Sequence, residues 1–262
     1  MKRHRFEAPV PPARMSYLEI LEKVGFTFNE NYKIGKGRYS RVIQGLYQGA
    51  QKKFAIKVID LENVTADFRN KFLPREIQCW KMLSHPNICF LYREFVKCNY
   101  QFAIMDLATH GDLLAYVQKN GPVPEPTART WMCQLLNALG YLHSHHIAHR
   151  DLKMENMLLF NNGGTMVVKI SDFGFCKQST DLSLTYCGSK SYSAPEILNG
   201  SVYDMFKADI WSMGVVGFVM LTNTMPFRED VKSNAIIIEA QCHRRYRYPH
   251  NLCLSVACRT TV

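Results

Sequence analysis

One short run of the sequence, from His149 to Asn156, concentrates acidic, basic and amide side chains. Within it, Asp151 and Lys153 are two positions apart, and the run follows a long stretch of helical periodicity. A carboxylate in such a run can accept or orient a hydroxyl proton, and a nearby ammonium group can neutralise developing negative charge. Taken alone, so short a run can also arise by chance.

A second acidic motif, Asp172-Phe173-Gly174, follows the apolar stretch from Met166 to Ile170. An aspartate at the end of a strand can bind Mg²⁺, which prefers oxygen ligands and keeps part of its water shell. The motif therefore predicts a site for a divalent cation close to the end of a strand.

Two glycines, Gly35 and Gly37, lie one residue apart in a run that ends at Val42. Such glycines allow a tight strand–turn–strand, and they let backbone N–H groups approach a polyphosphate. A dinucleotide site predicts a helix after the glycines, whereas residues 42–47 have the composition of a strand. That site is disfavoured, and in isolation a glycine-rich turn without a ligand is the favoured interpretation.

Lys57 lies inside the apolar stretch from Phe54 to Val58. A buried ammonium group is costly unless a phosphate or a carboxylate pairs with it. Glu76, on the next predicted helix, is the candidate carboxylate. A lysine on an exposed strand face is the alternative.

The elements that must position these motifs change in character along the chain. Residues 26–59 are rich in β-branched and aromatic residues broken by glycine, and residues 88–107 predict two more strands. The spacing of apolar residues predicts helices over 65–83, interrupted by Pro74, and over 126–145, 207–221 and 231–242. We expect an α+β fold of two lobes with a junction near residues 105–111.

The motifs occur in one order, and Ala194-Pro195-Glu196 follows them. Together they resemble the signature of protein serine/threonine kinase catalytic domains, with Lys153 indicating the serine/threonine branch. The resemblance extends from about residue 28 to residue 249. Residues 34–40, 72–76, 111–114 and 171–175 are similar to the testis-specific serine/threonine kinases, within the calmodulin-kinase-like group.

This resemblance implies a small β-rich N-lobe and a larger helical C-lobe. It places a basic, proline-containing extension at residues 1–27 and a kinase domain at residues 28–262, with the N-lobe at about 28–105, the hinge at 106–111 and the C-lobe at 112–262. We expect the C-lobe to be incomplete, because further helices and an arginine partner for Glu196 normally follow. Loss of that partner is expected to lower the stability of the lobe.

The resemblance also assigns roles around ATP and Mg²⁺. The glycine-rich run covers the phosphates, Lys57 contacts them and pairs with Glu76, and the hinge offers backbone groups to the adenine. The implied nucleotide-binding residues are Ile34, Gly35, Gly37, Val42, Ala55, Lys57, Glu76, Met105, Asp106, Leu107, Asp112 and Leu158. Asn156 and Asp172 are the implied metal ligands.

For the transfer itself, the resemblance makes Asp151 the group that accepts or orients the substrate hydroxyl proton. Lys153 neutralises charge on the transferring phosphoryl group, and Asn156 completes the catalytic set. The implied reaction is transfer of the γ-phosphate of ATP to serine or threonine hydroxyls of proteins.

The segment between Asp172 and Glu196 is the implied activation segment. Thr185 lies where relatives carry an activating phosphate, placed there by an upstream kinase, and Arg150 is its expected partner. Ser183 is a second candidate for modification. Ser189 is expected to contact Asp151 and Lys153.

Acidic residues near the implied cleft bear on the choice of substrate. Glu155 and Asp112 could accept a substrate arginine, which favours a basic consensus around the acceptor. For Glu155, a solvated acid with no such role is about as plausible an interpretation.

Two other interpretations remain open. The first is a truncated, catalytically weak kinase-like module that binds or regulates, favoured by the early end of the C-lobe. The second is nucleic-acid binding, supported only by the formal net charge of +10.

The nine cysteines include no C-x-x-C pair, which argues against a disulfide framework and fits an intracellular protein in the cytoplasm and also the nucleus. The longest apolar run, Met213–Leu221, is too short to span a bilayer. We therefore expect protein substrates as partners, with no nucleic acid and no membrane.

Overall fold

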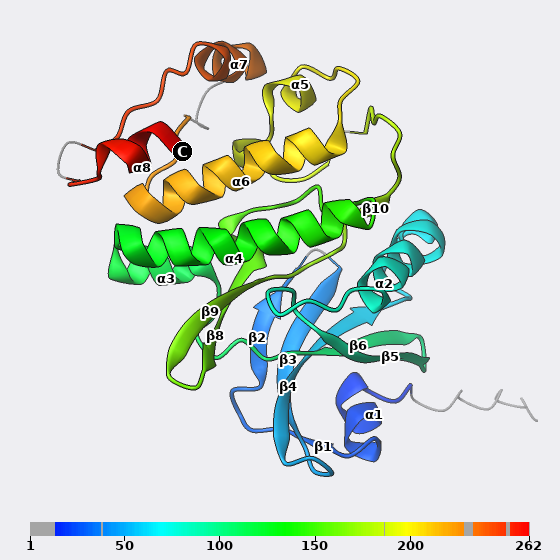
Figure 1. Cartoon of the computed structure of the whole chain (residues 1–262). Helices are drawn as coiled ribbons and strands as arrows, with labels where there is room; N and C mark the ends of the chain where they lie inside the picture. The colour runs from blue at the N-terminus through cyan, green and yellow to red at the C-terminus, as the bar shows by residue number, and fades with distance from the viewer. Residues whose placement is uncertain (1–13, 38, 186, 228–232, 250–251, 262) are drawn as a thin grey trace, which may run out of the picture. The chain divides into compact units, whose positions relative to one another are not determined.

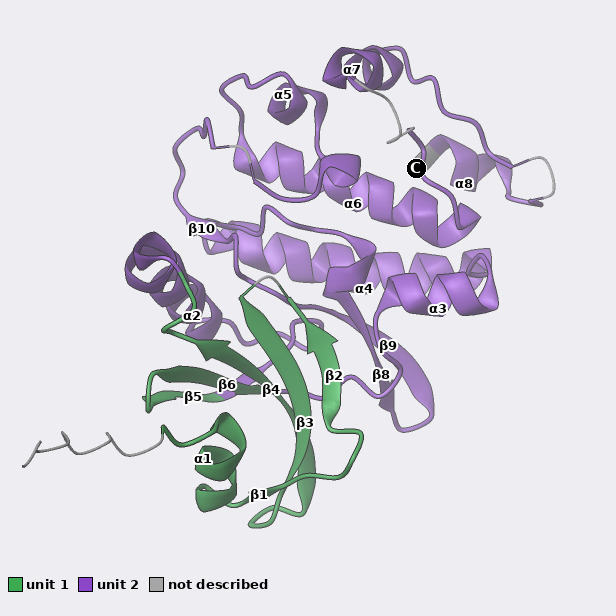
Figure 2. Cartoon of the chain, turned by 180° about the vertical axis from the view of Figure 1, so that it is seen from behind, with its two compact units in different colours: residues 1–64, 93–104 green, residues 65–92, 105–262 purple. Residues whose placement is uncertain are grey.

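The computed structural model describes residues 14–37, 39–185, 187–227, 233–249 and 252–261. The chain forms two compact units (Figure 2): unit 1 comprises residues 1–64 and 93–104, and unit 2 comprises residues 65–92 and 105–262. Strands dominate the described part of unit 1 and helices that of unit 2, so the predicted α+β class is confirmed. Of the predicted extension over residues 1–27, residues 1–13 lie outside the described part, and residues 14–27 include a helix and a short strand. The predicted domain boundaries stay predictions.

Unit 1 is built on a sheet whose described strands run in the order β1-β3-β4-β6-β5, with β2 added alongside β3. The elements are α1 (Tyr17–Lys23), β1 (Phe26–Thr27), β2 (Lys33–Lys36), β3 (Ser40–Tyr47), β4 (Lys52–Asp60), β5 (Leu91–Lys97) and β6 (Tyr100–Met105). The glycine-rich run is a hairpin of β2 and β3, with Gly35 opposite Val42. The predicted strand–turn–strand is therefore present.

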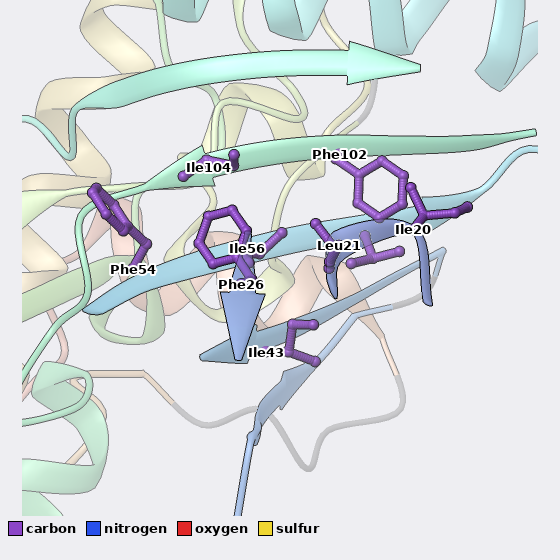
Figure 3. Close-up of a cluster of buried hydrophobic side chains, with 9 residues drawn as sticks. Ile20, Leu21, Phe26, Ile43, Phe54, Ile56, Phe102 and Ile104 are labelled. Atoms are coloured by element: carbon purple, nitrogen blue, oxygen red, sulfur yellow. The ribbon is translucent and has the colours of Figure 1, made fainter. Parts of the chain in front are cut away.

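Helix α1 packs against this sheet through Ile20 and Leu21, which are fully buried beside Phe26 and Ile43 (Figure 3). A capping box starts the helix: the hydroxyl of Ser16 accepts from the backbone N–H of Glu19, and the carboxylate of Glu19 accepts from the N–H of Ser16. The sequence analysis did not predict this helix, although a serine three residues before a glutamate at the start of an apolar run is its usual signature.

Unit 2 contains helices and short antiparallel strand pairs, β8 with β9 and β7 with β10. Its helices are η1 (Phe68–Phe72, a π-helix), α2 (Leu73–Lys81), α3 (Leu113–Asn120), α4 (Glu125–Ser144), α5 (Pro195–Leu198), α6 (Met205–Thr222), α7 (Asn234–Cys242) and α8 (Val256–Thr261). Two 3₁₀ turns are η2 (Met154–Asn156) and η3 (Lys190–Tyr192), and the strands are β7 (Ile147–Ala148), β8 (Met157–Asn162), β9 (Thr165–Ile170) and β10 (Lys177–Gln178).

The predicted helix over residues 65–83 is divided at Pro74. The π-helix η1 ends at Phe72, and α2 begins at Leu73 with the proline in its first turn. A proline is tolerated there because the first N–H groups of a helix have no intrahelical acceptor. The helix predicted over 231–242 begins at Asn234, and its first two residues lie outside the described part.

Helix α6 runs beside α4 through the middle of unit 2 (Figure 1). Asp204 caps it by accepting from the backbone N–H groups of Phe206 and Lys207, and Asn223 ends it in the left-handed conformation. By length and composition α6 is long and apolar enough to cross a membrane, but 67% of its apolar window is buried in the protein. Such burial is typical of the core helix of a folded domain.

The outer side of α6 is only partly covered. Ile210 is 53% exposed. A groove of about 380 Å³ runs along this side between α6, α7 and α8, with Trp211, Phe218 and Tyr246 in its walls. Ile210 is therefore an apolar side chain of α6 that lines this groove and stays exposed.

Candidate active site

Asp151, Lys153 and Ser189 form a closed triangle of polar contacts in unit 2. The hydroxyl of Ser189 donates to Oδ1 of Asp151 at 3.0 Å, and Nζ of Lys153 lies 2.9 Å from Oδ2 of the same carboxylate. Nζ of Lys153 also donates to the Ser189 hydroxyl at 3.0 Å. The carboxylate is 5% exposed and the lysine side chain 21%. The structure thus brings together the predicted acid, cation and serine.

Asn156 contacts the same carboxylate at Oδ2, the oxygen that also faces Lys153. Its amide Nδ2 donates to the backbone carbonyl of Asp151 at 2.8 Å and to Oδ2 at 3.3 Å. The amide oxygen Oδ1 is then the remaining polar atom of the Asn156 side chain. The backbone carbonyl of Asn156 accepts from the N–H of Ser171 at 2.9 Å, which fixes the residue preceding Asp172. The two predicted metal ligands therefore come from adjoining backbone segments.

A buried aspartate on α6, Asp209, anchors the backbone at the start of the run from His149 to Asn156, called the catalytic run below after its predicted role. Its Oδ2 accepts from the N–H of His149 at 2.8 Å, and its Oδ1 accepts from the N–H of Arg150 at 2.8 Å. Arg150 has a φ of 69°, a left-handed conformation that costs free energy in a non-glycine residue. The paired hydrogen bonds offset that cost. Nε2 of His143 lies 3.0 Å from Oδ2 of Asp209 as well.

The ring of His149 is fully buried, and both its nitrogens are used within the site. Nε2 lies 3.0 Å from the carbonyl of Ser171, so this nitrogen carries the proton. Nδ1 is then the acceptor for the N–H of Asp151 at 3.3 Å. The ring also packs edge-on against Phe173, with centroids 5.2 Å apart. His149 therefore joins the catalytic run to the Asp172-Phe173-Gly174 motif.

Gly174 lies close to the carboxylates of both Asp172 and Glu76. A β-carbon at this position would lie 3.3 Å from Oδ1 of Asp172 and 3.6 Å from Oε2 of Glu76. Glu76 is 3% exposed on α2, and Asp172 has a φ of 61°. Trp80, one turn after Glu76 on α2, is buried and packs against Phe173, with centroids 5.9 Å apart. The structure thus places Glu76 next to the predicted metal-binding motif.

Gly188 of the predicted activation segment lies against the backbone of Arg150. A β-carbon there would lie 2.5 Å from the backbone oxygen of Arg150, and the φ of this glycine is 88°. The guanidinium of Arg150 donates to Sγ of Cys187 at 2.6 and 3.1 Å. Thr185 is exposed two residues before Cys187, whereas Ser183 is 4% exposed. Of the two candidates for modification, only Thr185 is accessible.

The predicted nucleotide-binding residues of unit 2 lie in and beside the predicted hinge, residues 106–111, and at Leu158. Met105 is buried, and Leu107 is half-buried. Asp112 caps α3 by accepting from the N–H of Ala115 at 2.8 Å, and it forms a β-bridge with Leu158. The structure thus brings Asp112 and Leu158 together, and Asp112 has a structural role that the sequence analysis did not assign.

The predicted residues of unit 1 lie on neighbouring strands. Val42 on β3 is opposite Lys57 on β4, and Ala55, two positions earlier, is buried. Gly35, Gly37 and Ile34 are exposed on or beside β2. The pairing of Lys57 with Glu76 stays a prediction.

The protein kinase domain family matches residues 28–257 of the chain. The chain belongs to this family. It is 35% identical over 271 residues to human testis-specific serine/threonine-protein kinase 4, covering 96% of this chain and 80% of the relative. It is 38% identical over 245 residues to human testis-specific serine/threonine-protein kinase 3, with 89% of this chain and 88% of the relative covered. Rat serine/threonine-protein kinase SIK1 is 38% identical over 208 residues, covering 78% of this chain and 26% of that protein.

These matches confirm the predicted family resemblance and the enzyme class, protein serine/threonine kinase. In this kinase domain, the sequence analysis missed Asp209, Gly188 and the contact of Arg150 with Cys187. Asp209 had a readable signal, because an aspartate within an otherwise apolar helix is seldom buried without partners. Gly188 and Cys187 had none, since their importance depends on a contact with a distant segment.

Proposed function

We propose that the chain transfers the γ-phosphate of ATP to serine and threonine hydroxyls of protein substrates. The observation that carries this proposal is the triangle of Asp151, Lys153 and Ser189. A carboxylate that already accepts a hydroxyl hydrogen bond from Ser189 has the geometry to accept one from a substrate hydroxyl. Lys153, on the same carboxylate, supplies positive charge beside the acceptor.

Two residues of unit 2 fit a divalent cation. The carboxylate of Asp172 and the amide oxygen of Asn156 are both oxygen ligands, which Mg²⁺ prefers. The Nδ2 contacts of Asn156 with Asp151 leave its Oδ1 for such a cation. When bound, Mg²⁺ would neutralise negative charge on the phosphates. The chain's own contribution is to hold both ligands through the Asn156–Ser171 backbone contacts.

The predicted nucleotide-binding residues offer chemical groups that suit the parts of ATP. In unit 1, the β2–β3 hairpin with Gly35 and Gly37 exposes backbone groups suited to phosphates, and Lys57 offers a cation. In unit 2, the segment from Met105 to Leu107 offers backbone groups to an adenine edge. We propose that these residues, together with the other implied nucleotide contacts, bind ATP.

We further propose that phosphorylation of Thr185 by an upstream kinase raises activity. Thr185 is exposed, and its backbone oxygen accepts from the hydroxyl of Tyr203 at 2.9 Å. The guanidinium of Arg150 contacts Cys187, which lies two residues after Thr185. A phosphate carries about two negative charges near neutral pH and pairs well with arginine. Full activity of Thr185→Ala after treatment with an activating kinase would contradict this.

A basic substrate consensus is part of the proposal. Glu155 is exposed on the 3₁₀ turn after Lys153, where it can meet an arginine of a substrate. Peptides with arginine before the acceptor should have a lower KM than their alanine counterparts. Glu155→Gln should reduce that preference and leave the KM for ATP unchanged.

The names of two relatives also motivate a biological proposal, a role in spermatogenesis. Its test is the tissue distribution of the protein. Absence from testis with strong expression elsewhere would rule the role out.

The test of the activity compares four proteins: the wild-type chain, Asp151→Asn, Asp172→Asn and the control Asp67→Asn, whose aspartate is exposed before η1. Transfer from Mg²⁺-ATP to a basic serine peptide should fall at least about a thousandfold in the first two variants and stay unchanged in the control. Equal activity in wild type and Asp151→Asn would overturn the proposal. Nucleotide binding without any transfer in a folded wild type would favour the alternative, a binding or regulatory module.

Two observations favour that alternative. Glu196 has no ion-pair partner within the described part of the chain, and Ile210 on α6 is exposed. The predicted energetic cost is smaller than that of a buried carboxylate, because Glu196 is itself half-exposed and stays hydrated.

A further inference from the structure

The carboxylate of Asp106 is the meeting point of three separate segments of unit 2. Oδ2 accepts from Nζ of Lys169 on β9 at 2.8 Å, and Oδ1 accepts from the hydroxyl of Tyr92 at 2.8 Å. The backbone N–H of Phe90 donates to Oδ2 at 3.2 Å. One side chain thus joins the segment after β6, the start of β5 and the strand β9.

The two charged groups of this cluster are largely buried, whereas Phe90 and Tyr92 are exposed. The side chains of Asp106 and Lys169 are 13% and 19% exposed. Burial alone would raise the pKa of Asp106, but the hydrogen bonds from Lys169 and Tyr92 outweigh it and hold the pKa below the ordinary value of a carboxyl group. Lys169 is itself held from the side, because Nζ lies 4.8 Å from the ring centroid of Phe160. The carboxylate is therefore ionised and fully engaged at neutral pH.

The backbone of Asp106 is fixed at both ends as well. Its N–H donates to the carbonyl of Phe90 at 3.2 Å, and its carbonyl accepts from Sγ of the buried Cys89 at 3.8 Å. Together with the side-chain contacts, these bonds leave the peptide groups on either side of Asp106 little freedom to rotate. A ligand that binds these peptide groups would find them already ordered, and pre-ordering lowers the free-energy cost of binding.

We propose that Asp106 is a positioning residue for the nucleotide: its carboxylate fixes the backbone of residues 105–107, whose peptide groups receive the adenine edge. This inference rests on the proposed function, because it requires that ATP binds there. It goes beyond that function, because it predicts that the side chains of Asp106 and Lys169 raise the affinity for ATP without touching ATP.

The primary test measures ATP affinity and turnover in wild type, Asp106→Asn and Lys169→Met. Each variant removes the charge pair and keeps most of the side-chain volume. A hydrogen bond to a charged group is typically worth about tenfold in an equilibrium constant. We expect the KM and Kd for ATP to rise about tenfold, kcat to change less than about twofold, and the KM for peptide to stay constant. The double variant should be no worse than the worse single variant, because both remove the same interaction.

A second readout does not depend on activity. In the protein without nucleotide, Asp106→Asn should show faster amide hydrogen exchange at residues 105–108. Exchange in α3 and α4 should stay unchanged. Tyr92→Phe removes the hydroxyl that donates to Asp106 and keeps the ring. This milder variant tests the same cluster if Asp106→Asn fails to fold. It should raise the KM for ATP by a smaller factor in the same direction.

The matched control is Glu239→Gln, which breaks the ion pair of Glu239 with Arg245 at 2.9 Å between side chains that are 55% and 60% exposed. It should change neither KM nor exchange. If wild type binds ATP and Asp106→Asn loses thermal stability with an unchanged Kd for ATP, the carboxylate is only structural and the inference is wrong. If wild type binds no ATP, the proposed function fails and this inference fails with it.

Discussion

The hydroxyl of Ser189 donates a hydrogen bond to the carboxylate of Asp151, a residue 38 positions earlier in the chain. The contact joins the activation segment to the catalytic run, and Lys153 closes it into a triangle. The state of the activation segment is thereby linked to the orientation of the proposed acceptor of the substrate proton.

Replacing Ser189 by alanine should lower kcat by about tenfold, since a hydrogen bond to a charged group is worth roughly 1.5–3 kcal/mol. Threonine has the same hydroxyl, so Ser189→Thr should retain most of the activity. Initial rates with a basic serine peptide, measured at saturating ATP, check this. An alanine variant as active as wild type would show that the triangle is dispensable.

Gly188→Ala should destabilise unit 2 by roughly 2 kcal/mol or more. The added β-carbon would meet the Arg150 carbonyl at 2.5 Å, and the φ of 88° is unfavourable for alanine. Urea unfolding measures the change. Gly140→Ala in α4, where a β-carbon meets nothing within 4 Å, is the control and should gain about 0.5–1 kcal/mol.

Asp209→Asn should loosen the catalytic run. Both carboxylate oxygens accept from backbone N–H groups, of His149 and Arg150, whereas an amide offers only one acceptor. One buried N–H is left unsatisfied, at a cost of about 1–3 kcal/mol. Hydrogen exchange of the His149 and Arg150 amides should quicken, and kcat should fall. Unchanged exchange at both amides would mean that other contacts hold the loop.

Cys89 should resist alkylation in the folded protein. Burial, with a further contribution from the nearby Asp106 carboxylate, raises the pKa of this thiol to about 12, so almost none is thiolate at pH 9. The exposed Cys133 and Cys242 should react with iodoacetamide under the same conditions. Peptide mapping by mass spectrometry distinguishes them. After unfolding in urea, all three should react at similar rates.

The same thiol predicts how stability depends on pH. Its pKa in the folded state lies above the unfolded value of about 8.5. Its contribution to stability is therefore complete below pH of about 8.5 and is lost as the pH rises toward 12. The free energy of unfolding of Cys89→Ala should decline less steeply over pH 8.5–10.5 than that of wild type.

Much of the site was predictable because its chemistry is local in sequence. Asp151, Lys153 and Asn156 occupy one short run, and the resemblance to the kinase signature assigns them to one site. The β2–β3 hairpin was predictable for a similar reason, since glycines with strand-forming neighbours specify a turn without help from the rest of the chain.

What escaped prediction depends on contacts between distant segments. Gly188 is required by the carbonyl of Arg150, and Asp106 is engaged by Tyr92 and Lys169, none of which a local pattern reveals. Helix α1 is a different case. Its capping box was readable, but its proximity to a charged, proline-containing start obscured the two buried residues that dock it.

The anchoring of the catalytic run by Asp209 also bears on the order of folding. The acceptor of the His149 and Arg150 amides lies 60 and 59 residues further along the chain. During synthesis, the run therefore leaves the ribosome well before α6 exists to receive it. The His149 and Arg150 amides can gain these two hydrogen bonds only after residue 209 has been added. A nascent chain that ends before residue 209 has the chemical groups of the run but lacks this anchor for its backbone.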